Sequence, residues 1–149
     1  MDAVIDDRLL IEEILVGLRR PRARLHTTAY WYYRACRAAK LGAGGHLSGP
    51  FLSLPHAEQE LAVGSMLQLP ETIVLPEPRR VVPLMVDTSQ RHPRLNLLNL
   101  EAVATARLLQ AKVWLSPEGA AGALPDVLTA ENLEWETITP SPGLPATRR

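Results

Sequence analysis

The sequence predicts a single α/β domain in which a mostly parallel β-sheet is flanked by helices. Three observations lead to this prediction. Short apolar or β-branched segments alternate with longer segments of helical periodicity, which is the order of β-α-β units. The 149 residues are enough for one hydrophobic core but too few for two ordinary domains. The apolar residues, 46% of the chain, include a single Phe, so aliphatic packing of helices on a sheet is favoured.

The first half of the chain reads as two β-α units followed by a glycine-rich loop. Apolar residues recur at helical spacing after each short strand, and a threonine stands where the second helix would be capped. The expected elements are a strand at 3–5, a helix at 8–16, a strand at 23–27, a helix that Thr27 or Thr28 caps and that ends near Lys40, and a loop or hinge at 41–50 with four Gly.

The second half continues the alternation. Prolines close or open several of its segments, and β-branched residues mark its strands. We expect a helix at 58–69, a strand at 72–75, a helix from about Pro83 to Gln90, a helix at 100–111 capped within 96–99, a strand at 112–115, a short helix at 124–130 and an edge strand at 135–139. The domain thus spans 1–139, and the proline-rich residues 140–149 should form a mobile tail.

Charge and composition limit the classes of partner. Sixteen basic and sixteen acidic side chains give a formal net charge of zero, so no overall field draws the protein to nucleic acid or to a membrane. Any contact with RNA must therefore be local. Arginines do gather at 19–24 and at 79–94, where they either bind phosphates or form an ordinary solvated surface.

The compartment follows from cysteine usage and from the N-terminus. Cys36 is the single cysteine, which excludes an internal disulfide and the common structural zinc sites. The first residues carry acids where a secretory signal needs basic side chains, and no apolar run approaches the roughly 18 residues that suggest a membrane span. We expect a cytoplasmic protein with no membrane contact.

Acidic residues follow the predicted strands at three places. Asp6 and Asp7 come after the first strand, Glu101 lies at a helix start, and Glu118 follows the strand that ends at Leu115. Ligands of parallel α/β domains bind beyond the carboxyl ends of the strands, and carboxylates gathered there bind Mg²⁺, which can activate water for phosphodiester hydrolysis. Each acid alone is equally typical of a helix first turn, where the helix dipole favours negative charge.

An aromatic run lies in the second predicted helix. Tyr30, Trp31, Tyr32 and Tyr33 could offer stacking faces to unpaired bases. Four consecutive helical residues point in all directions, however, so at least two of them should belong to the core and the others can cover a partner surface.

The order of these features resembles the PIN-domain family, which includes the toxin ribonucleases of bacterial toxin–antitoxin pairs. The resemblance spans about residues 3–139 and rests on three short motifs. They are Val4-Ile5-Asp6-Asp7-Arg8-Leu9-Leu10, Leu100-Glu101-Ala102 and Leu115-Ser116-Pro117-Glu118.

This resemblance implies a PIN-like fold and a Mg²⁺- or Mn²⁺-dependent ribonuclease activity. Asp6, Glu101 and Glu118 would be the catalytic metal ligands and Asp7 an auxiliary acid. It also implies RNA as substrate, a protein partner such as an antitoxin, and a homodimer.

Departures from the family pattern open a second hypothesis. Family enzymes usually have Asp where this chain has Glu101 and Glu118, and a Ser or Thr where it has Arg8. The fourth acid of the family aligns with Arg34, whose guanidinium cannot bind a cation but can pair with the remaining acids. The chain is therefore either an active nuclease or a PIN-like binding module with a degenerate acidic site.

Overall fold

A parallel sheet forms the centre of the molecule. The computed structural model describes residues 1–18, 22–42 and 45–140. Within them the sheet has five strands in the order β3-β2-β1-β4-β5, and every neighbouring pair is parallel. The strands are β1 (Asp2–Ile5), β2 (Arg24–His26), β3 (Ile73–Val74), β4 (Lys112–Leu115) and β5 (Trp135–Thr137).

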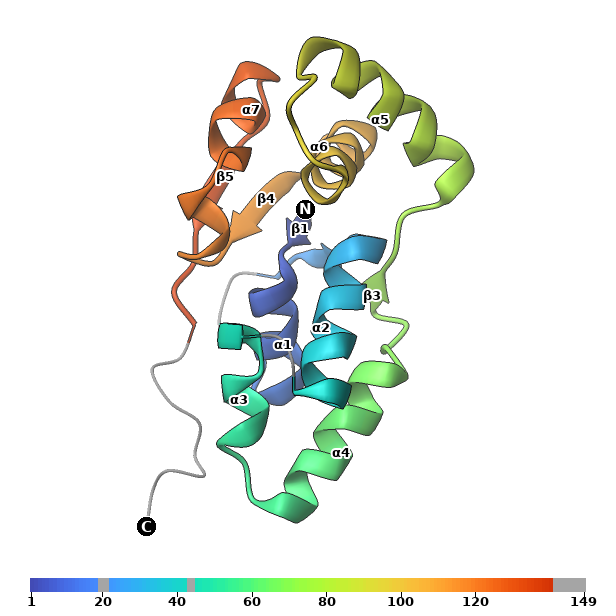
Figure 1. The fold of residues 1–149 in the computed structure, drawn as a ribbon. Helices are drawn as coiled ribbons and strands as arrows, with labels where there is room; N and C mark the ends of the chain where they lie inside the picture. The colour runs from blue at the N-terminus through green and yellow to red at the C-terminus, as the bar shows by residue number, and fades with distance from the viewer. Residues whose placement is uncertain (19–21, 43–44, 141–149) are drawn as a thin grey trace.

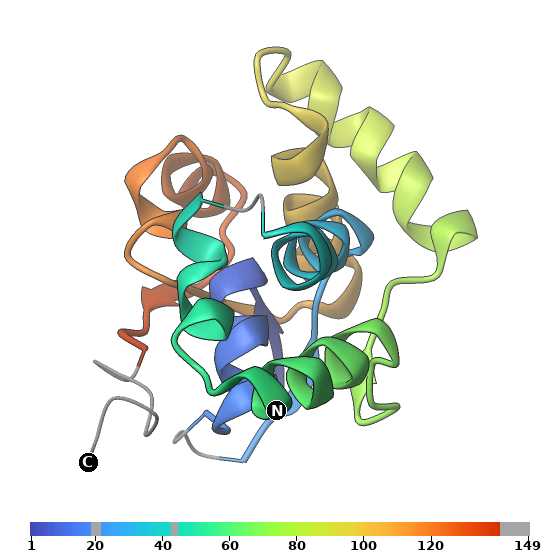
Figure 2. The same ribbon diagram turned by 60° about the horizontal axis from the view of Figure 1, so that its bottom comes forward.

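Helices cover both faces of the sheet (Figure 1). They are α1 (Asp7–Leu15), α2 (Ala29–Leu41), α3 (Gly49–Leu52), α4 (His56–Leu67), α5 (Pro78–Arg91), α6 (Leu97–Leu109) and α7 (Leu124–Ala130), with short 3-10 turns at Gly45–Leu47 and Gly119–Ala121. Figure 2 shows α4 lying across the lower ends of α1 and α2, which it contacts, while α5 packs on α6. This is the predicted single α/β domain with a mostly parallel sheet.

Two hydrophobic cores follow from the alternation of side chains along the strands. In β1, Ala3 and Ile5 face the helices α1 to α4, while Val4 faces α6 and α7. In β4, Trp114 lies in the first core, and Val113 and Leu115 lie in the second. Both strands are buried on both faces, as parallel strands between helix layers must be, because successive side chains point to opposite sides.

Side-chain oxygens cap the first turns of three helices. Asp6 precedes α1 and its carboxylate accepts the N–H of Leu9 at 3.0 Å. Thr28 caps α2 through its hydroxyl, which accepts the N–H of Trp31 at 3.0 Å. Asn96 caps α6 in the same way. A side-chain oxygen satisfies one of the free backbone donors of each first turn.

Helix α5 begins earlier than predicted. We expected a start near Pro83, but the helix starts at Pro78, with Glu77 as its cap, and Pro83 lies inside it. Pro83 is exposed, so its ring stands on the solvent side, while Val81 and Thr88 are buried and Thr88 accepts a hydrogen bond from Arg107 of α6 at 2.8 Å. The packing of α5 on α6 therefore outweighs the local preference of an interior proline to end a helix.

Helical turns form within residues 45–50, where a loop was predicted. A 3-10 turn at Gly45–Leu47 leads into α3, whose first turn contains Pro50. Leu47 and Phe51 are buried in the core beside α1 and α2, and this burial holds the segment in a helical path. The predicted tail falls almost wholly on 141–149, which lie outside the described residues.

No helix among the residues described is both long and apolar enough to span a bilayer.

Candidate functional site

The direction of the chain reverses between β1 and β4. From β1 the chain moves outward to β2 and β3, and after β4 it moves the other way to β5. Such a switch point leaves a crevice at the carboxyl ends of the two central strands, where α/β proteins bind their ligands. Asp6 and Asp7 leave β1 there, and Ser116 leaves β4.

Asp6 is fully buried, and both of its carboxylate oxygens accept hydrogen bonds from the protein. Oδ1 accepts the N–H of Leu9 at 3.0 Å, and Oδ2 accepts the backbone N–H and the hydroxyl of Ser116 at 2.8 and 2.7 Å. Burial raises the pKa of Asp6 to about 6, with a further rise from the neighbouring Asp7, although the donors at Leu9 and Ser116 oppose it. Asp6 thus joins β1, α1 and β4.

Gly119 leaves the space that Asp6 occupies. A Cβ at position 119 would overlap Oδ2 of Asp6, whereas a Cβ at Gly122, in the same turn, would meet nothing. We therefore expect Gly119→Ala to lower the free energy of unfolding by about 2 kcal/mol, as overpacking in a buried site does. Gly122→Ala is the matched control and should be close to neutral in urea unfolding.

A double variant checks the cause. Asp6→Ser keeps a capping oxygen on a shorter side chain. The cost of Gly119→Ala should then be smaller in the Asp6→Ser background than in the native chain, because the overlap has been removed. Equal costs in both backgrounds would contradict the assignment.

Arg34 pairs with Asp7. Its Nε lies 3.0 Å from Oδ2 of Asp7, and the Arg34 side chain is 45% exposed while that of Asp7 is 10% exposed. The other oxygen of Asp7 accepts the N–H of Arg8 at 2.8 Å. Burial raises the pKa of Asp7 and the positive charge of Arg34 opposes that rise. A guanidinium thus neutralises one of the acids at the switch point.

Glu101 holds the start of α2. Oε2 accepts the N–H of Ala29 and Oε1 accepts the N–H of Tyr30, both at 2.9 Å. The carboxylate is buried, and it faces the positive end of the α2 dipole. Glu101 also lies more than a turn inside α6, which starts at Leu97, rather than at the expected helix start.

Glu118 is exposed and makes no capping hydrogen bond. It lies on the wall of a cavity of about 180 Å³ at the switch point. The lining residues are Asp7, Trp31, Arg34, His46, Leu98, Asn99, Glu118, Gly119, Gly122 and Leu124. This cavity is the candidate functional site.

The described acids are not gathered as metal ligands in this arrangement. Asp6 and Glu101 hold backbone N–H and hydroxyl donors with their carboxylates, and Asp7 is paired with Arg34. Among the described residues, no group of three or more His, Cys, Asp or Glu side chains could hold a metal ion. A Mg²⁺ site needs several oxygen ligands that converge on one point.

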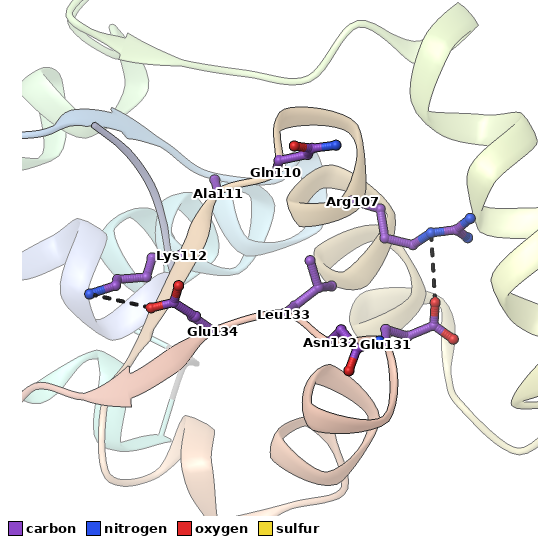
Figure 3. A pocket seen from close by; sticks show the side chains of 8 residues that line it. All are labelled: Arg107, Gln110, Ala111, Lys112, Glu131, Asn132, Leu133 and Glu134. Carbon is purple, nitrogen blue, oxygen red and sulfur yellow. Dashed lines mark ion pairs between the residues drawn. The ribbon is translucent and has the colours of Figure 1, made fainter.

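A second cavity, of about 330 Å³, lies at the opposite ends of β4 and β5 (Figure 3). Its charged side chains are already paired across it. Arg107 faces Glu131 at 3.7 Å and Lys112 faces Glu134 at 3.7 Å. Glu131 also accepts two hydrogen bonds from Arg91, which together with His92 lower the pKa of Glu131 to about 2. This end of the sheet is an ion-pair network that ties α5, α6 and α7 together.

Sequence analysis missed several residues of the candidate site. His46 and Asn99 line the cavity, although neither belongs to a motif. The position of Ser116 directly after a central strand was the signal that it could contact Asp6, because β1 and β4 are neighbours at the switch point.

A solved structure has a similar fold. The chain superposes on VapBC-1 from nontypeable Haemophilus influenzae with a TM-score of 0.52 and 16% sequence identity, covering 92% of this chain and 98% of that chain. The fold is PIN-like. No model of a protein family matches the sequence, and no curated protein matches it.

Two of the sequence motifs lie directly after the neighbouring strands β1 and β4. Asp6 and Asp7 follow the first strand, and Ser116-Pro117-Glu118 follows the strand beside it, as the resemblance implied. Arg34 extends from α2 toward the same crevice, where it pairs with Asp7. The predicted fold is confirmed, and the predicted metal and catalytic roles of Asp6, Glu101 and Glu118 remain hypotheses.

Proposed function

We propose that this chain is a toxin-type PIN-like protein whose acidic site is degenerate, and that it works as a binding module for nucleic acid or for a protein. The observation that carries the proposal is the contact between Arg34 and Asp7, in which a guanidinium neutralises an acid at the switch point. A permanent positive charge there does for the acids what a divalent cation would otherwise do, because it relieves the repulsion between them.

The hydrogen bonds of the other acids support the same conclusion. Asp6 joins two strands and a helix, and Glu101 satisfies two free donors of α2. These hydrogen bonds give Asp6 and Glu101 structural roles that require no metal, because they satisfy backbone donors at the starts of helices and the end of a strand. The module would act in the cytoplasm, with an antitoxin-like protein, RNA or a second copy of the chain as partner.

The alternative is an active Mg²⁺- or Mn²⁺-dependent ribonuclease. Asp7 and Glu118 do line one cavity, which favours it. In this alternative, Asp6, Glu101 and Glu118 would bind the metal and Asp7 would assist. Coordination would use the lone pairs of Asp6 and Glu101 that their present hydrogen bonds leave over.

Isothermal titration with Mg²⁺ and Mn²⁺ separates the two functions. We expect no binding by the native chain, and binding to appear in Arg34→Glu, which places an extra acid beside Asp7 at the cavity. Arg37→Glu is the matched control, because it adds the same charge one turn further along α2, outside the cavity lining, and should bind no metal.

An RNA-cleavage assay with either metal completes the test. The native chain should leave RNA intact. Metal binding by the native chain that Glu118→Gln abolishes, together with cleavage that the same substitution abolishes, would overturn the binding module in favour of the nuclease. Glu118 is suited to this purpose because it is exposed, so its replacement should leave the fold unchanged.

A further inference from the structure

The solvent side of α2 carries aromatic and cationic side chains in one line. The line consists of Tyr30 and the residues three, four and seven positions after it, which lie on the same face of a helix: Tyr33, Arg34 and Arg37. All four are exposed, Tyr33 to 62% and Tyr30 to 42%. At the helical rise, they span about 10 Å along the axis.

The other aromatic residues of this helix belong to its inner side. Trp31 is buried in the core beside α6 and α7, and Tyr32 donates its hydroxyl to the carbonyl of Met66 at 2.9 Å. This agrees with the prediction that at least two of the four aromatics serve the core. The hydrophobic core therefore does not account for the two outward tyrosines.

All charged side chains of α2 are positive. The helix contains Arg34, Arg37 and Lys40 and no acidic residue, in a chain whose formal net charge is zero. Arg37 and Lys40 make no ion pair with any residue that the structure describes. Free cations next to exposed aromatic rings attract phosphates and offer flat faces to bases.

We propose that this face of α2, formed by Tyr30, Tyr33, Arg34 and Arg37, binds single-stranded nucleic acid, with the tyrosines stacking on bases and Arg37 contacting the backbone. The inference rests on the proposed function and names its ligand. Single strands fit better than duplexes, because only unpaired bases expose their faces to stack on tyrosine. An acidic protein is the alternative ligand for this face, and the same experiment distinguishes it from nucleic acid.

The test is fluorescence anisotropy of a labelled single-stranded RNA oligonucleotide, with EDTA present so that binding is measured without metal or cleavage. We expect the native chain to bind the single strand more tightly than the matching duplex. Tyr33→Ala should weaken binding about tenfold, since stacking on an aromatic side chain contributes on the order of 1–3 kcal/mol per base. Arg37→Gln should reduce the salt slope by about 0.7.

Arg79→Gln is the matched control, because Arg79 is an exposed arginine of another helix, α5. The Arg79→Gln variant should bind the oligonucleotide as tightly as the native chain does. Equal weakening by Arg79→Gln would show that only diffuse charge is involved and would overturn the assignment. No binding at about 10⁻⁴ M, the weak end of non-specific affinities, would also overturn it and leave a protein as the partner.

The two proposals fail in different ways. RNA cleavage by the native chain in Mg²⁺ would refute the degenerate site, while the EDTA measurements would still report on the α2 face. RNA that is neither cut nor bound would refute the α2 face alone.

Discussion

Glu101→Ala is expected to lower the free energy of unfolding by about 3 kcal/mol, or roughly 10 °C in Tm. The substitution leaves the N–H groups of Ala29 and Tyr30 without the carboxylate that now accepts both, at a helix start that is partly buried. It also removes a negative charge from the positive end of the α2 dipole. Urea unfolding measures the loss.

Glu118→Ala is the matched control. In the nuclease hypothesis Glu101 and Glu118 are equivalent metal ligands, so neither should matter greatly to the stability of a metal-free protein. The contacts predict otherwise, because Glu118 is exposed and makes no capping bond. We expect Glu118→Ala to be neutral and Glu101→Gln to be intermediate, since an amide retains a single acceptor oxygen. Equal effects of the two alanine variants would contradict the structural role of Glu101.

Ionisation of Asp6 should lower the free energy of unfolding of the native chain as the pH rises from about 4 to about 6. The pKa of Asp6 is raised from 3.8 to about 6 in the folded protein, mainly by burial. In this interval the folded state holds a proton that the unfolded state has lost, so each step upward in pH favours unfolding. The protonated Asp6 contributes its full stabilisation below pH 3.8, and this stabilisation is lost by about pH 6. The loss amounts to about 3 kcal/mol of unfolding free energy.

Asp6→Asn removes this titration. Comparing the free energy of unfolding at low and neutral pH in the native chain and in Asp6→Asn isolates the contribution of Asp6. Asp7, whose pKa is also raised by burial, is present in both proteins. Asp126→Asn is the control, because Asp126 is an exposed acid of α7, and it should leave the native pH profile in place. An unchanged profile in Asp6→Asn would refute the burial effect.

Much of the fold could be predicted because local pattern and tertiary structure agree. The alternation of apolar strands and amphipathic helices predicted the sheet, and Thr28 was one of the two expected caps of α2. The acids after β1 and β4 were expected at one edge, and Asp7 and Glu118 do line one cavity there. Pro83 was misleading, because the packing of α5 on α6 overrides a local helix breaker on an exposed face.

The role of Glu101 could not be predicted, because its partners are 71 and 72 residues away in the sequence. A glutamate near a helix start is equally typical of a metal ligand and of a first-turn acid, and here it serves a different helix. The partner of Arg34 could be anticipated in kind, since an arginine among acids forms an ion pair, but the choice of Asp7 depends on how α2 lies against α1.

The two outermost strands of the sheet are very short. β3 has two residues and β5 has three, so each edge offers about 7–10 Å of backbone to another chain. Open strand edges are the usual template for strand addition and for amyloid-like growth, and short ones give too few hydrogen bonds to capture a foreign strand. The sheet edges of this chain therefore present little backbone on which its own copies could polymerise.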